Sequence, residues 1–142
     1  MNYFSNEFST MKKLFLIFGL SFIINWIWEN AHAVLYFLPN GESISQYMLL
    51  RSTFFDAIFT LLVAFIFIKF PYFNQRKWYA LVFGIVVAVL LEKIALGMGF
   101  WAYTEFMPII PFINTGLTPT IQLGVISYTV LSFFDLKIKI FK

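Results

Sequence analysis

Four long apolar stretches constrain the fold of this chain more than any other feature of its sequence. They cover approximately residues 14–38, 47–70, 78–101 and 118–134. Each is close to the roughly 20 residues that a helix needs to cross a bilayer, and a helix satisfies its own backbone hydrogen bonds in lipid. The sequence therefore predicts an all-α integral membrane protein. We expect one membrane domain over residues 1–142, a four-helix transmembrane bundle running up-down-up-down, with an irregular Pro-containing segment at 102–117 before the fourth helix.

The composition supports a membrane protein. Hydrophobic residues make up 61% of the chain and charged residues only 12%, whereas soluble domains are about 25% charged. The chain has no cysteine, which excludes disulfides and thiolate metal sites. The formal net charge is +3, but the basic residues fall at the predicted helix ends, so they indicate topology and not nucleic-acid binding.

The basic residues predict the orientation. They precede the first stretch, flank the second loop and occupy the C-terminal end: Lys12, Lys13, Lys69, Arg76, Lys77, Lys137, Lys139 and Lys142. The first and third loops contain no Lys or Arg. By the positive-inside rule both termini are cytoplasmic, and we expect the protein in a bacterial cytoplasmic membrane.

The N-terminal stretch also has some features of a signal peptide, with Lys12 and Lys13 before an apolar run and Ala31-His32-Ala33 after it. Bulky tryptophans stand where a cleavage region prefers small polar residues, and the apolar run continues beyond them. We therefore expect a retained helix.

Ionisable residues inside these apolar stretches are the main functional signal. They are Glu29, His32, Asp56 and Glu92, and His32 is the only histidine. A charged side chain at the centre of a helix in lipid costs at least about 2.5–3.5 kcal/mol, so such residues are functional candidates. Glu29, His32 and Glu92 are predicted to lie in the outer half of the membrane and Asp56 near its midplane, and all four are expected to converge on a cavity in the bundle. We expect them to be the catalytic residues.

Further residues are predicted to line this cavity. Helical spacing puts Asn25, Glu29, His32 and Tyr36 on one face. Arg51 and Lys93 are the expected countercharges, and tryptophans and tyrosines would contact an apolar substrate. The full set of predicted cavity residues is Asn25, Trp26, Tyr36, Arg51, Lys93, Trp101, Tyr103, Asn114 and Gln122.

Acid–base chemistry on a lipid or isoprenoid is the function that this pattern favours. Such catalysis needs a buried carboxyl group beside a second group in the other protonation state. We expect Glu29 and His32 to form the acid–base pair, with Asp56 and Glu92 as partners. No cofactor is required, and the ligand would be a lipophilic molecule that reaches the site from the bilayer.

The sequence leaves alternatives open. Glu29, His32, Asp56 and Glu92 would also suit a single divalent metal ion, since Glu-x-x-His spacing occurs in metal-binding bundles. The same residues would suit a proton- or cation-coupled transporter or channel subunit. A non-catalytic ligand-binding or assembly subunit and a homo-oligomer are further possibilities. No phosphate-binding loop, nucleophile elbow or dinucleotide motif is present.

One segment has a local resemblance to a known family. Gly99-Phe100-Trp101-Ala102-Tyr103, with Met107-Pro108 and Pro119-Thr120-Ile121-Gln122 after it, resembles membrane carotenoid-modifying proteins of the lycopene-cyclase type. Those proteins combine a Trp-x-Tyr element with a later Pro that is closely followed by carboxylates. Here Ile121 and Gln122 stand at the place of the carboxylates, so the resemblance does not extend to the acidic residues. It covers about a sixth of the chain.

Overall fold

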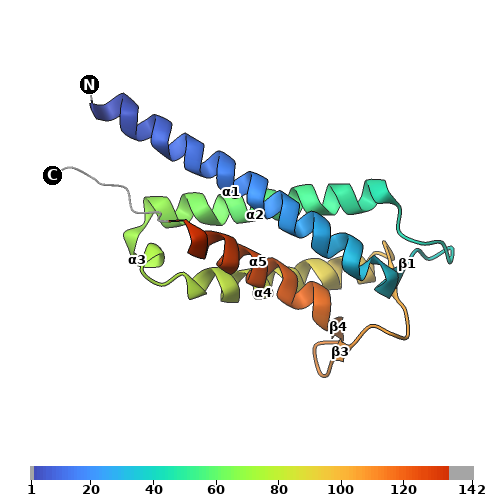
Figure 1. Cartoon of the computed structure of the whole chain (residues 1–142). Helices are drawn as coiled ribbons and strands as arrows, with labels where there is room; N and C mark the ends of the chain where they lie inside the picture. The colour runs from blue at the N-terminus through green and yellow to red at the C-terminus, as the bar shows by residue number, and fades with distance from the viewer. Residues whose placement is uncertain (1, 135–142) are drawn as a thin grey trace.

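Four helices lying alongside one another dominate the structure, a computed structural model that describes residues 2–134, with side chains from Thr10 onward (Figure 1). They are α1 (Asn2–His32), α2 (Gln46–Lys69), α4 (Trp78–Gly97) and α5 (Leu117–Phe133). Three segments, Thr10–Leu35, Gln46–Lys69 and Trp78–Gly97, are long and apolar enough to cross a membrane, and α5 is a shorter apolar helix. The lysines at 137, 139 and 142 lie outside the described residues.

Helix α1 ends earlier than residue 38, where the sequence led us to expect its end, and begins before residue 14. After His32 the chain makes one 3₁₀ turn, η1 (Ala33–Leu35), and then extends as β1 (Tyr36–Phe37). This strand pairs antiparallel with β2 (Ala102–Tyr103), and Tyr36 lies opposite Tyr103. The tertiary pairing with β2 takes the place of the last predicted turn of helix.

Helix α2 matches its predicted range closely because both of its ends carry local signals. The Ser45 side chain accepts a hydrogen bond from the Met48 backbone N–H at 3.3 Å, which caps the start of the helix. Pro71, which cannot continue a helix, follows its end. Pro71 instead begins the short helix α3 (Pro71–Asn74) in the segment predicted as a loop.

Helix α4 ends at Gly97, four residues before the predicted end. Gly99 adopts a φ of 68°, a left-handed conformation that glycine allows at no steric cost. The Phe100 N–H donates to the Ala95 carbonyl and the Gly99 N–H to the Leu96 carbonyl, which together make a Schellman cap. Gly99 could therefore have predicted the end of α4, which the hydrophobic pattern alone did not indicate.

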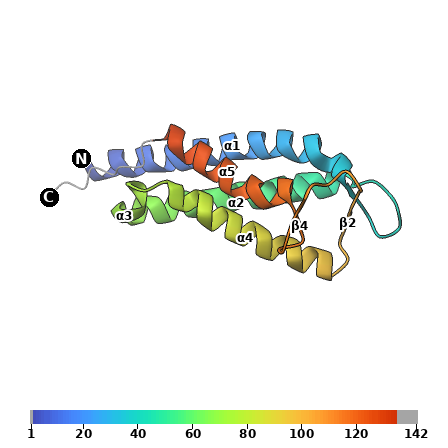
Figure 2. The ribbon, with the colours of Figure 1, turned by 90° about the horizontal axis from the view of Figure 1, so that it is seen from below.

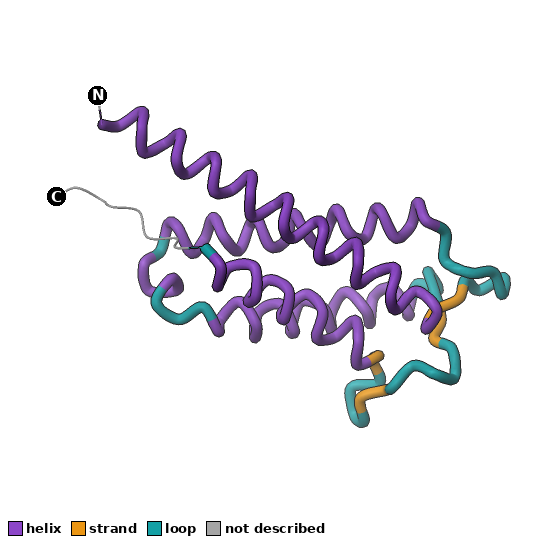
Figure 3. The backbone as a smooth tube through the Cα atoms, viewed as in Figure 1, coloured by secondary structure: helices purple, strands orange, loops and turns teal. Residues whose placement is uncertain are grey.

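The segment between α4 and α5 is irregular, as predicted, but it also contains very short strands that were not predicted. Besides β2, these are β3 (Ile109–Ile110) and β4 (Thr115–Gly116), which pair with each other. Figure 3 shows all of these strands and the longer loops at one end of the molecule. The opposite end holds α3 and the connection between α2 and α4 (Figures 1 and 2).

Two glycines allow α4 and α5 to cross in close contact. A Cβ atom on Gly84 would lie 2.4 Å from the Gly124 Cα, and one on Gly124 would lie 2.4 Å from the Leu81 carbonyl oxygen. Small residues let helix backbones approach in this way. Helix α5 also packs on α1 and α2, whereas the backbones of α2 and α4 stay farther apart and meet through side chains, such as the stacked rings of Phe59 and Phe83.

The interior is divided into an apolar half and a polar half. The apolar half, next to α3, is a cluster of Ile17, Val63, Ala64, Phe67, Ala80, Ile126, Val130 and Leu131. The polar half, towards the strands, buries Asn25, Glu29, His32, Glu92 and Gln122. A hydrogen bond of 2.9 Å between Thr60 and Ser127 lies between the two. Because many large apolar side chains, such as Phe15 and Val86, are exposed instead, the outer surface suits lipid better than water.

Candidate functional site

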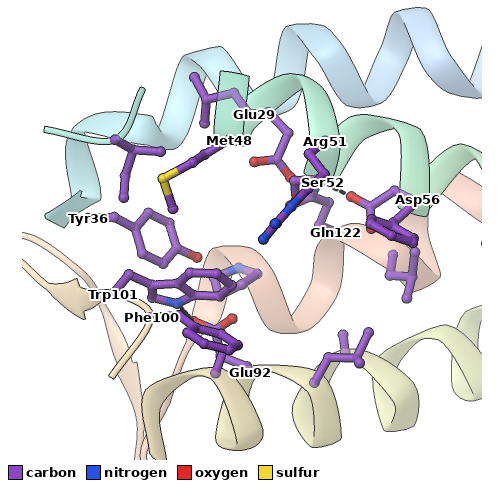
Figure 4. A pocket seen from close by; sticks show the side chains of 18 of the residues that line it. Glu29, Tyr36, Met48, Arg51, Ser52, Asp56, Glu92, Phe100, Trp101 and Gln122 are labelled. Atoms are coloured by element: carbon purple, nitrogen blue, oxygen red, sulfur yellow. Dashed lines mark hydrogen bonds between the residues drawn. The ribbon is translucent and has the colours of Figure 1, made fainter. Parts of the chain in front are cut away.

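A cavity of about 570 Å³ lies between α2 and α4 in the polar half of the molecule (Figure 4). Glu29, His32, Asp56, Glu92 and Gln122 contribute polar groups to its wall, and most other lining side chains are apolar. This size and this mixture of surfaces are typical of small-molecule sites.

The cavity opens sideways through the apolar surface between α2 and α4. Three of its lining residues, Phe55, Leu62 and Leu91, are also 55–63% exposed. This opening exists because α2 packs mainly on α1 and α4 mainly on α5, which leaves the backbones of α2 and α4 apart. An apolar ligand would therefore reach the polar groups without crossing water.

Gln122 connects three helices at the centre of the site. Its Nε2 lies 2.7 Å from Glu29 Oε1, 3.0 Å from Asp56 Oδ2 and 3.2 Å from Asn25 Oδ1. An amide nitrogen has only two hydrogens, so it cannot donate fully to all three oxygens at once. The interaction links α5 to α1 and to α2, and it gives Gln122 the largest set of polar contacts in the site.

Glu29 and Asp56 form a close carboxyl pair around this amide. Ser52 donates a second hydrogen bond to Glu29 Oε1, at 3.2 Å. The two carboxyl groups are close neighbours, because an oxygen of each lies within 3.0 Å of the same amide nitrogen. Two carboxylates have only acceptors to offer, so a hydrogen bond between them would need a proton on one.

Glu92 lies across the cavity in a different setting. Its Oε1 accepts hydrogen bonds from Trp101 Nε1 at 3.1 Å and from the Tyr103 hydroxyl at 2.6 Å. The Tyr103 oxygen in turn accepts from the Gly116 N–H at 2.8 Å. Burial, with the hydrogen bond to Glu92, raises the pKa of Tyr103 above its usual value, so this hydroxyl remains a donor to Glu92 at neutral pH.

His32 has one ring nitrogen committed to the backbone. Its Nδ1 lies 2.6 Å from the Trp28 carbonyl oxygen, which can only accept, so Nδ1 carries the hydrogen. The ring also contacts Tyr36, with the ring centroids 5.4 Å apart. Nε2 is therefore the nitrogen available to a ligand. Among the described residues His32 and Glu29 make no hydrogen bond to each other, although both line the cavity.

The structure brings most of the predicted cavity residues to the site. Tyr36, Arg51, Trp101 and Gln122 line the cavity, while Asn25 and Tyr103 contact the residues that do. Trp26 is half-buried outside the lining, and Lys93 and Asn114 are exposed outside it. Asn114 instead occupies the turn between β3 and β4 with a φ of 56°, a conformation that asparagine tolerates better than most residues.

The predicted countercharges do not neutralise the carboxylates. In the described part of the chain, neither Arg51 nor Lys93 lies within 4 Å of a carboxylate oxygen. The carboxyl groups receive hydrogen bonds from neutral donors instead, namely Gln122, Ser52, Trp101 and Tyr103. Tryptophan and tyrosine donors satisfy a buried carboxylate without the need to bury a second charge.

The polar residues of α2 do not all face the cavity. Thr53 and Thr60 are buried and do not line it, and the Thr53 hydroxyl has no partner among the described residues. Ser52 was missed as a site residue. Its spacing of four residues before Asp56 could have indicated that the two share a face.

The four residues considered for a metal ion do not assemble into a metal site here. Among the described residues, no group of three or more His, Asp or Glu side chains is placed to hold one. Glu92 and the Glu29–Asp56 pair come from different walls of the cavity (Figure 4).

Tyr103→Phe is expected to lower stability by about 1–3 kcal/mol, because the change leaves the Gly116 N–H without a partner and removes one of the two donors to Glu92. Thermal unfolding in detergent would measure the loss.

The raised pKa of Tyr103 also means that the folded state holds this proton more tightly, so wild-type stability falls as pH rises above about 10. The Tyr103→Phe variant should lose less stability than the wild type over that pH range. Tyr47→Phe, at a tyrosine that is 73% exposed, is the control and should leave both results unchanged.

Comparison of the chain with protein-family models, curated proteins and solved structures finds no match.

Proposed function

We propose that this protein spans the membrane four times, with both termini cytoplasmic, and that its cavity lies in the outer half of the bilayer. Two observations support this orientation. Lys12, Lys69 and Lys77 belong to the end of the molecule next to α3, where the positive-inside rule places the cytoplasm. Lys77 also donates to the Leu131 and Phe134 carbonyls, both at 2.7 Å, which holds the end of α5 on that side.

We further propose that the cavity binds a lipid or isoprenoid and modifies it by proton transfer. The observation that carries this proposal is the contrast between two carboxyl centres on opposite walls of one apolar cavity. The two carboxyl groups of the Glu29–Asp56 pair have only Gln122 and Ser52 as donors between them, whereas Glu92 alone accepts from both Trp101 and Tyr103. Pairs of titratable groups in contrasting environments are the usual basis for assigning an acid and a base.

The Glu29–Asp56 pair is the proton donor in this proposal. One proton shared between the two carboxyl groups satisfies both and avoids two adjacent negative charges. That proton passes to one carbon of a ligand double bond, whose π electrons form the new C–H bond. The neighbouring carbon becomes a cation, which the faces of Trp101 and Tyr36 stabilise by cation–π contact.

Glu92 is the proton acceptor. It removes a proton from a carbon next to the cation, and the electrons of that C–H bond form a new double bond. The net reaction is a shift of the double bond within the ligand. A proton then returns from Glu92 to the carboxyl pair, with His32 Nε2 as the relay between the two walls, and these acidic protons exchange with water between turnovers. The cycle consumes no oxidant, reductant or cofactor.

Deuterium incorporation tests this reaction. The purified protein is incubated in heavy water, in nanodiscs that contain lipid extracted from the producing cells, and the lipids are examined by mass spectrometry. Wild-type protein should add deuterium to one isoprenoid or lipid class. Glu29→Gln and Glu92→Gln should each reduce the rate at least about 100-fold, since general acid–base catalysis contributes roughly 10²–10⁴. Glu42→Gln, at an exposed loop position, is the matched control and should keep full activity.

Transport is the rival function, and a flux measurement on the same purified protein distinguishes it from the enzyme reaction. The apolar cluster that fills the half next to α3 favours a one-sided site over a path across the membrane. If wild-type protein incorporates no deuterium but conducts protons across liposomes, and Glu29→Gln abolishes that flux, the enzyme proposal is wrong.

A further inference from the structure

We infer that the ligand carries an anionic head group, a phosphate or a carboxylate, and that Arg51 binds it while the apolar part of the ligand lies along α2. This inference rests on the proposed function, because it assumes that the cavity holds a lipophilic molecule. It adds the chemical class of the head group and the direction in which the ligand lies.

Arg51 extends into the cavity. It is one of the lining residues, and Figure 4 shows its side chain reaching down from α2 towards the space between Tyr36 and Glu29. Arg51 and Lys93, the two basic residues at this end of the helices, are both exposed, but Lys93 on α4 does not line the cavity. Only Arg51 therefore faces the ligand site.

The Arg51 guanidinium has no anionic partner from the protein. Within residues 10–134 it forms no ion pair and no hydrogen bond, since the nearby carboxyl groups take their donors from neutral side chains. A guanidinium is always charged and offers five N–H donors. Its planar shape suits a phosphate or carboxylate, which it binds through two parallel hydrogen bonds.

The remaining lining residues of α2 set the direction of the ligand. Beyond Arg51 the helix presents Phe55, Asp56, Phe59 and Leu62 to the cavity. At 1.5 Å per residue, these positions extend about 16 Å from Arg51. A head group at Arg51 therefore places an apolar chain along this wall, with Asp56 beside the chain and not beside the head group. The acid pair would act on the chain.

Three probes with the same chain test this inference: hexadecyl phosphate, hexadecanoate and hexadecanol. Their binding to the wild-type protein is measured in nanodiscs of phosphatidylcholine, by competition with a radiolabelled form of each. At least one anionic probe should bind about tenfold or more tightly than the alcohol, as expected of a charge-assisted pair. The ratio between phosphate and carboxylate identifies which anion the site prefers.

Arg51→Gln should remove the preference for the anion and leave binding of hexadecanol unchanged, and Arg51→Lys should restore part of the preference. Lys93→Gln removes one positive charge outside the cavity, so it should change none of the three affinities. If the alcohol binds as tightly as both anions, or if Lys93→Gln has the same effect as Arg51→Gln, the inference is wrong although the cavity still takes a lipophilic ligand. If none of the probes binds, both this inference and the proposed function are wrong.

Discussion

Gly124→Val is expected to prevent α4 and α5 from packing and to cost at least about 3 kcal/mol, enough to unfold much of the protein. Even a Cβ atom at this position would lie 2.4 Å from the Leu81 carbonyl oxygen and 3.0 Å from Ile85 Cγ1. The first of these neighbours is backbone and cannot rotate away. The helices would have to separate, and α5 carries Gln122, so the site would be lost as well.

Thermal unfolding and size-exclusion chromatography in detergent measure this effect. Gly19→Val is the matched control, because nothing lies within 4 Å of a Cβ atom built on Gly19 in α1. It should cost less than about 1 kcal/mol, the scale of helix propensity. A Gly124→Val protein that is monodisperse and unfolds within about 2 °C of the wild type would show that the close crossing does not exist.

Gln122→Leu is expected to be the most damaging change in the polar half, with a loss of about 3 kcal/mol or more. Leucine has a similar size but no donor. Glu29 and Asp56 would lose the amide they share, and Asn25 Oδ1 would lose its link to α5. An unsatisfied buried group costs about 1–3 kcal/mol, and more when it is charged.

Gln46→Leu provides the comparison for this change. Gln46 makes one hydrogen bond, to Asn30, at an exposed position. Gln46→Leu should therefore lower stability by no more than about 0.5 kcal/mol. Stability alone does not test the site, so binding of hexadecanol is measured on the same variants. Gln122→Leu should weaken it, and Gln46→Leu should not. Equal unfolding temperatures for the two variants would contradict the central position assigned to Gln122.

The segment that resembles carotenoid-modifying membrane proteins contributes Trp101, Tyr103 and Gln122 to the polar contacts of the site. In that pattern carboxylates follow the later proline, whereas this chain has Ile121 and Gln122 there. Gln122 nevertheless lies at the centre of the site, where it donates to carboxyl groups from α1 and α2. Trp101 and Tyr103 both donate to Glu92. The comparisons assign the chain to no family, so these contacts stand on the geometry alone.

The sequence determined the helices and the identity of the ionisable residues that line the cavity. An apolar run of about 20 residues has few alternatives to a helix, and local signals fixed several ends: Ser45 capped α2, and Pro71 stopped it. Glu29, His32, Asp56 and Glu92 were conspicuous because ionisable groups are rare in such runs. All four line the cavity.

Only the tertiary structure decided which donors those groups receive. That choice depends on how each helix is rotated about its axis and how closely it approaches its neighbours, which hydropathy does not encode. The crossing at Gly84 and Gly124 sets the approach of α4 and α5, and the β1–β2 pairing brings Tyr103 beside Tyr36. Spacing along the chain placed Arg51 and Lys93 near the carboxylates, but packing gave the carboxylates neutral donors, because these satisfy buried oxygens without burying a further charge.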